Sequence, residues 1–140
     1  MEGGAQICPA CFRVIALQAV RCPRCGADLA KLSQRDYAEK LILALEHPLD
    51  DVRMRAILAI GWRRDAGAAQ ALVDCALRHP RDVVQAIAVV GSLARLLPRD
   101  AANLALARLA DAHPAHAIQV AARQMVERTS SEEPHGSDRS

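Results

Sequence analysis

The chain has 140 residues, enough for one compact domain or for a small module joined to a medium-sized one. Apolar residues make up 51% of it and aromatic residues only 2%, so the interior must be aliphatic and rich in alanine, which suits closely packed helices better than an enzyme with a deep aromatic-lined pocket. The net charge of +2 is too small to predict a polyanionic partner, and no apolar run approaches the roughly 20 residues that a transmembrane helix needs.

Two Cys-x-x-Cys pairs lie near the N-terminus, Cys8 with Cys11 and Cys22 with Cys25. Each short loop can point two thiolates at one place, so two facing loops complete a tetrahedral shell for Zn²⁺. No positive segment followed by an apolar one precedes them, so we expect a cytoplasmic protein with reduced thiols. Two disulfides or a redox-active thiol pair are the alternatives. Four protein ligands leave no position for water or substrate, which predicts one structural zinc ion without catalysis.

At residues 7–30 the chain resembles the short zinc-ribbon family, whose two knuckles follow a Cys-Pro-x-Cys-Gly pattern. The second knuckle matches this pattern, with Gly26 after its second cysteine. In the first knuckle Phe12 stands where the family has glycine, a departure that concerns the geometry of the turn and not the metal ligands. The β-branched residues between the knuckles predict a short β-hairpin within residues 12–21.

Beyond the cysteines the chain repeats itself with a period near 33. A His-Pro step recurs at His47, His79 and His113, and apolar residues around it recur at helical spacing. Such a period predicts stacked helical hairpins. One core position is shared by the three copies: Val52, Val84 and Ile118. We expect helices at about 34–46, 50–63, 67–78, 82–96, 100–112 and 116–128, the first opened by Ser33 as its N-cap.

The segment from Asp51 to Gly61 is similar to the Asp-x-Val-Arg-x-x-Ala-x-x-Ala-Leu-Gly signature of HEAT repeats, in the subgroup found in phycobilin lyases. This resemblance implies a mainly α fold, a three-repeat HEAT-like α-solenoid carrying a small N-terminal zinc ribbon with four cysteine ligands. The functions of that family are too varied to transfer. The expected domains are a zinc ribbon at 1–32, helical repeats at 33–129 (33–64, 65–97 and 98–129) and a polar, disordered tail at 130–140.

A helical array of this kind binds partners through a ridge formed by the second helix of each pair. The residue after the shared core position is polar in every copy, as Arg53, Gln85 and Gln119, and Arg55 and Arg123 lie nearby. We expect these five side chains to form a polar row on one face, where a protein partner would dock. A merely solvated face is the alternative.

No other residues predict a catalytic site. The three histidines occupy the same turn of successive repeats, so they should lie along the array instead of converging, and Cys75 among apolar residues is interpreted as a buried small side chain. Neither a Ser-His-Asp arrangement nor a Gly-rich phosphate loop is present. We therefore expect a non-enzymatic adaptor with a protein partner, no membrane association and no small-molecule substrate.

Two other functions stay open, a nucleic-acid-associated protein and an accessory subunit of an enzyme. For the first, the ribbon offers Arg13, Arg21 and Arg24 as contacts to RNA or DNA, although these arginines also offset the −2 charge of a zinc ion bound by four thiolates. The short link after Asp28 suggests a structural hypothesis as well. Because the end of a repeat stack would otherwise expose an apolar side, we expect the ribbon to fold against the first helical pair as a cap.

Overall fold

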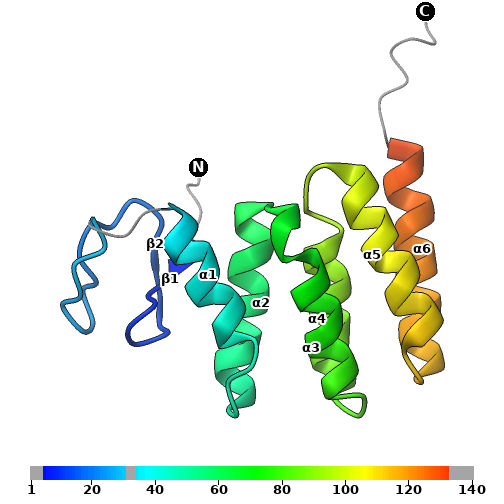
Figure 1. The fold of residues 1–140 in the computed structure, drawn as a ribbon, viewed down its shortest axis with the longest axis horizontal. Helices are drawn as coiled ribbons and strands as arrows, with labels where there is room; N and C mark the ends of the chain where they lie inside the picture. Colours follow the sequence, from blue (N-terminus) through cyan, green and yellow to red (C-terminus); the bar gives the residue numbers. More distant parts are fainter. Residues whose placement is uncertain (1–4, 31–33, 133–140) are drawn as a thin grey trace, which may run out of the picture.

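A computed structural model describes residues 5–30 and 34–132 of the chain. Within these ranges two strands are followed by six α-helices and one short 3-10 helix: β1 (Ala5–Ile7), β2 (Val14–Ala16), α1 (Gln34–Ala44), α2 (Asp50–Arg63), η1 (Ala66–Ala68), α3 (Ala69–Arg78), α4 (Val83–Leu93), α5 (Arg99–Ala112) and α6 (His116–Glu132). The helices are paired in chain order, α1 with α2, α3 with α4 and α5 with α6, and the pairs lie side by side with the strands at one end (Figure 1). No helix in the described part of the chain is long and apolar enough to cross a membrane.

The helices form two layers, because successive pairs stack in the same orientation. The first helices α1, α3 and α5 make one layer, and the second helices α2, α4 and α6 make the other (Figure 1). Leucines from the first layer, including Leu41, Leu72 and Leu106, are buried between them, together with alanines that let the helices approach closely. The prediction of a mainly α, stacked-hairpin fold is confirmed.

The last helix continues further than its sequence suggested. We predicted a disordered tail from residue 130, but α6 runs to Glu132, so residues 130–132 are helical. The hydroxyl of Thr129 donates a hydrogen bond of 2.6 Å to the side-chain oxygen of Asn103 on α5, which fixes this turn to the array. The rest of the predicted tail and the predicted N-cap Ser33 lie outside the described residues.

The second and fourth helices approach each other unusually closely at Gly61. A Cβ atom at this position would lie 2.7 Å from Ser92 Oγ and 3.2 Å from Ser92 Cα. The hydroxyl of Ser92 in turn donates a hydrogen bond of 2.7 Å to the carbonyl oxygen of Ile57, one turn earlier in α2. The backbones of α2 and α4 are therefore in contact through a glycine and a serine, with no room for a larger pair.

The two strands enclose the first cysteine loop. β1 pairs antiparallel with β2, with Ile7 opposite Val14, and the side-chain amide of Gln6 donates to the carbonyl oxygens of Ala16 and Leu17. We predicted a hairpin within residues 12–21. That placement is wrong, because residues 5–7 supply β1 and the first cysteine loop is the turn of the hairpin.

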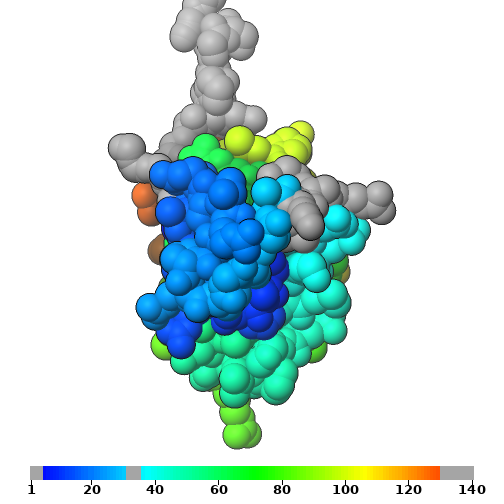
Figure 2. Space-filling model, turned by 90° about the vertical axis from the view of Figure 1, so that its left-hand side faces the viewer, coloured from blue at the N-terminus to red at the C-terminus, as the bar shows by residue number. Residues whose placement is uncertain are grey.

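The ribbon lies over the open end of the first helical pair, as Figure 2 shows from that end. Ile7 of β1 is fully buried in the same core as Leu41 of α1. The hydroxyl of Tyr37 on α1 accepts a hydrogen bond of 2.7 Å from Ile7 N and donates one of 2.5 Å to Ile7 O. The packing that we expected of an N-terminal cap is present in the structure.

Candidate functional site

The structure brings the four predicted metal ligands together. The sulfur atoms of Cys8, Cys11, Cys22 and Cys25 all lie within 4.8 Å of one another. The Sγ–Sγ distance is 3.6 Å between Cys8 and Cys25 and 3.8 Å between Cys11 and Cys22. Tetrahedral coordination with metal–sulfur bonds of about 2.3 Å places sulfurs about 3.8 Å apart. All four are free thiols, so this cluster could hold one metal ion.

The two cysteine loops have the same backbone geometry, although only one contains glycine. In the first, Phe12 N donates a hydrogen bond of 2.7 Å to Cys8 O; in the second, Gly26 N donates one of 2.9 Å to Cys22 O. Both donors have left-handed backbones, with φ of 63° at Phe12 and 81° at Gly26. The departure at Phe12 therefore leaves the turn unchanged, at a conformational cost of roughly 1–2 kcal/mol for a side chain with a Cβ.

Contacts with the helical array offset that cost. The ring of Phe12 meets the ring of His47 edge-on, with centroids 5.7 Å apart, at the turn between α1 and α2. Arg55 of α2 donates a hydrogen bond of 3.3 Å from Nη1 to Phe12 O. A glycine could accept the second contact but not make the first. Phe12 thus joins the metal loop to the first helical pair.

Backbone amides around the sulfurs favour an anionic site. Ala10 N lies 3.4 Å from Cys8 Sγ, and Arg24 N lies 3.3 Å from Cys22 Sγ. Burial raises the pKa of the Cys22 thiol, but the amides of Cys25 and Arg24 and the neighbouring thiols outweigh it, so the pKa falls to about 6. Burial raises the pKa of Cys8, so a bound cation would supply the remaining drive to ionise it.

Two of the predicted docking residues are not on the surface. Arg53 is 6% exposed and Gln85 is 1% exposed, so the expected polar row is wrong for both. Arg53 Nε donates a hydrogen bond of 2.7 Å to Gln85 Oε1, and its Nη1 donates to the carbonyl oxygens of His47 and Pro48 at 3.0 and 3.1 Å. These polar side chains form buried hydrogen bonds, because the turn after α1 leaves backbone carbonyl groups that need hydrogen-bond donors.

The other three predicted docking residues lie apart from one another. Gln119 is half-buried, and its Nε2 donates a hydrogen bond of 2.8 Å to His113 O. It therefore bonds the turn between α5 and α6, as Arg53 bonds the turn between α1 and α2. Arg55 is half-buried beneath the ribbon. Arg123 is exposed and lines a shallow hollow between α5 and α6 together with Glu127. The structure therefore forms no continuous polar row from these side chains.

The exposed side chains of α4 are apolar instead. Val84, predicted as a core residue, is 73% exposed, whereas Val52 and Ile118 are buried as predicted. Asp82 accepts a hydrogen bond of 2.9 Å from Gln85 N and so caps α4, which begins one residue later than the repeat alignment implies.

An apolar stripe results on the surface of the second layer. Ile87 is 46% exposed, Gly91 is exposed, and with Val84 they follow the spacing of one helical face. We call Val84, Ile87 and Gly91 the outer stripe.

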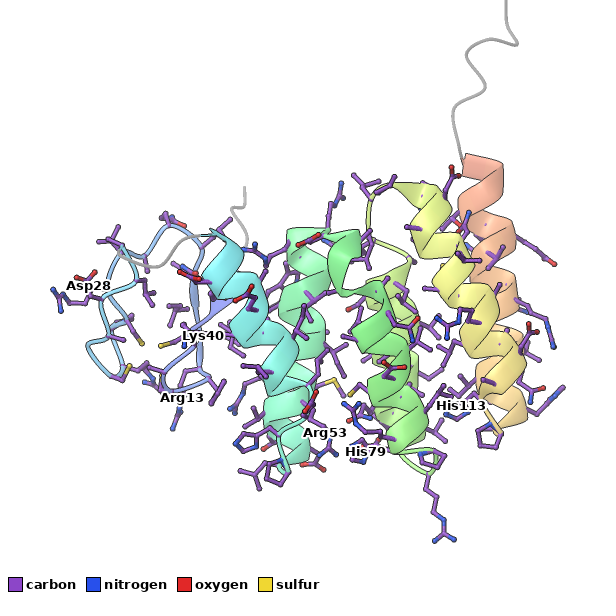
Figure 3. The ribbon with its side chains drawn as sticks, in the orientation of Figure 1. Arg13, Asp28, Lys40, Arg53, His79 and His113 are labelled. Atoms are coloured by element: carbon purple, nitrogen blue, oxygen red, sulfur yellow. The ribbon has the colours of Figure 1, made fainter. Side chains whose placement is uncertain are left out.

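The histidines stay apart, as predicted. Figure 3 shows His79 and His113 at the same edge of successive repeats. His47 Nδ1 accepts from Leu49 N at 3.1 Å and His113 Nδ1 accepts from Ala115 N at 3.0 Å, so both order the turn that follows them. Cys75 is fully buried, as expected of a small apolar side chain.

A family model described as HEAT repeats matches residues 18–94, more than half of the chain. The chain belongs to the HEAT-repeat family. No curated protein and no solved structure gives a significant match. The HEAT match ends just after α4, and the third pair, α5 and α6, stacks on the second in the same manner. HEAT repeats form helical scaffolds that usually mediate contacts between proteins.

Proposed function

We propose that this protein is a non-enzymatic, cytoplasmic HEAT adaptor. Its ribbon holds one structural Zn²⁺, and the solvent-facing side of α2, α4 and α6 binds a protein partner. The observation that carries this proposal is the outer stripe, an apolar surface in the middle of a repeat layer. A contiguous apolar patch of this kind marks an interaction site in many proteins.

The sulfur cluster supports zinc because of its donor set and its closure. Four thiolates at tetrahedral spacing suit Zn²⁺ better than the oxygen-preferring Mg²⁺ or Ca²⁺. With four protein ligands the metal would have no position for water, so its role would be structural. Native mass spectrometry of the purified chain should give one zinc per molecule, and Cys22→Ser should lose it. A metal-free wild-type chain in zinc-containing buffer would contradict this assignment.

The position of α4 supports the choice of docking face. It packs against α2 and α6 on either side, so the outer stripe faces away from every neighbouring helix. Leu58 of α2 is 39% exposed and adds apolar surface on the same layer. In the opposite layer α5 exposes Leu104 at 66% as a single large side chain, which makes no stripe.

The test compares these two surfaces with the same partner. Tagged wild-type protein would first capture its partner, which is then purified, and its dissociation constant is measured for each variant. Val84→Asp/Ile87→Asp should weaken binding at least tenfold, because two charges enter the apolar contact. Leu104→Asp, at a position that is 66% exposed on the opposite layer, should bind like the wild type. Unchanged binding by the double variant, with its helical circular dichroism intact, would exclude the outer stripe.

A further inference from the structure

A cleft with a volume of about 410 Å³ opens between the ribbon and α2. It is lined by Arg13, Val14, Ile15, Pro23, Arg24 and Arg55. A second cleft of about 390 Å³ shares three of these residues and reaches Cys11 and Cys25 of the metal cluster. Arg13 lies beside the sulfur atoms in Figure 3. We call the first of these the arginine cleft.

Three guanidinium groups reach the cleft from three different parts of the chain. Arg13 follows the first cysteine loop, Arg24 lies within the second, and Arg55 belongs to α2. Arg13 and Arg24 are exposed, while Arg55 is held by its hydrogen bond to Phe12 O. Among the residues that the structure describes, no Asp or Glu lines either cleft, and the three guanidinium charges exceed the −2 charge that a zinc ion bound by four thiolates would carry. Each guanidinium presents donors in a fork that matches a carboxylate or a phosphate, so the cleft suits an oxyanion.

The lining favours an acidic peptide over a nucleic acid. Half of the lining residues are apolar, with Val14 50% exposed, and none of the described lining residues is aromatic, so bases would have no ring to stack on. Asp51, exposed one turn before Arg55 on α2, places a negative charge next to this positive surface. A nucleic acid needs a longer positive track for its repeated charges. A short segment carrying two or three carboxylates fits the positive surface that is available.

We propose that the arginine cleft binds an acidic, extended segment of a protein partner. This inference rests on the proposed function only in taking the partner to be a protein. Arg55 and Leu58 are three residues apart on α2 and are therefore surface neighbours. A partner seated on the outer stripe can thus continue toward the cleft, where its carboxylates meet Arg13 and Arg24.

A peptide probe tests the cleft without the natural partner. Fluorescence anisotropy would follow a labelled ten-residue peptide of alternating glutamate and alanine added to the zinc-loaded full chain. Arg13→Gln/Arg24→Gln should weaken its binding about tenfold. Arg108→Gln/Arg128→Gln removes the same charge from exposed positions on α5 and α6 and should change it less than twofold. Zinc content and circular dichroism confirm that each variant folds.

Three results would overturn the inference. They are undetectable binding of the acidic peptide to the wild type, equal weakening by both arginine pairs, and tighter binding of a single-stranded ten-nucleotide DNA that is lost in Arg13→Gln/Arg24→Gln. The last result would assign the cleft to nucleic acid. Val84→Asp/Ile87→Asp should bind the peptide like the wild type. A negative peptide-binding result therefore does not affect the partner-binding test of the outer stripe, and a negative result for the outer stripe does not affect the peptide-binding test.

Discussion

The close approach of α2 and α4 predicts opposite effects of the same substitution at two glycines. In Gly61→Ala the new Cβ would lie 2.7 Å from Ser92 Oγ, 3.1 Å from Ser92 Cβ and 3.2 Å from Ser92 Cα. Rotating the hydroxyl away breaks its bond to Ile57 O and does not relieve the contact with the backbone atom. The two helices must therefore move apart, which loosens the joint between the first two repeats.

The magnitude follows from three terms. Overpacking of a closely packed interior costs about 1–3 kcal/mol. Loss of the Ser92 hydrogen bond costs about 1 kcal/mol, and the better helix propensity of alanine over glycine returns about 1 kcal/mol. The last two nearly cancel, so Gly61→Ala should reduce the free energy of unfolding by about 1–3 kcal/mol.

Gly91 provides the matched control. It is the third residue from the end of α4, as Gly61 is in α2, and a Cβ there would have no atom within 4 Å. Gly91→Ala should therefore stabilise the protein by about 0.5–1 kcal/mol. Urea unfolding followed by circular dichroism measures both. A Gly61→Ala variant as stable as Gly91→Ala would refute the close contact between the helices.

Three further predictions concern the ribbon and one buried histidine. Removal of the proposed zinc ion with a chelator should lower the melting temperature of the helices by several degrees, because the loop carrying Phe12 would no longer hold Ile7 against the array. Tyr37→Phe should cost about 1–3 kcal/mol in urea unfolding, because it leaves the N–H and C=O of Ile7 buried without partners. Burial lowers the pKa of His113, so the unfolded chain takes up the proton first and stability should fall as the pH drops below about 6.5. Urea midpoints at about pH 7.5 and about pH 5.5 should differ less in His113→Asn, whose oxygen can replace Nδ1.

Each of these predictions has a control. The control for chelation is Cys22→Ser, which should melt at the same temperature as the chelated wild type. Identical melting temperatures with and without metal would exclude a stabilising cap. Tyr37→Phe should bind the proposed zinc ion as the wild type does, since the two hydrogen bonds of the hydroxyl go to Ile7 and not to a cysteine sulfur. In His113→Asn the difference between the urea midpoints at the two pH values should become smaller but not disappear, because burial also lowers the pKa of His79. An unchanged difference between these midpoints in His113→Asn would contradict the assignment of the pH dependence to His113.

The sequence predicted the parts of the fold that follow from local spacing. Two Cys-x-x-Cys loops and a period near 33 suffice to predict the cysteine cluster and the helical pairs, because each depends on residues close in the chain. Residues whose hydrogen-bond partners are distant in sequence are harder to place from the sequence. Arg53 and Gln85 were placed on the surface because they are polar, whereas their partners are turn carbonyls and each other, 32 residues apart.

Other features had no signal in the sequence. Val84 aligns with Val52 and Ile118, which are buried, yet it is 73% exposed, and nothing in the repeat pattern distinguishes it from them. Nothing near Tyr37 indicates that its hydroxyl bonds a strand 30 residues earlier. The arginine cleft was also missed as a unit, since Arg55 and the ribbon arginines meet only after the ribbon docks.

The bond between Tyr37 and β1 has a consequence for association between molecules. Both backbone groups of Ile7 on the side away from β2 are taken by one phenol hydroxyl. A strand from another copy would find no donor or acceptor at that residue and could not extend the sheet there. In many proteins, charged side chains prevent strands of other molecules from adding to an exposed sheet edge. Here an aromatic residue of α1 does so at Ile7, where the ribbon is docked on the helices.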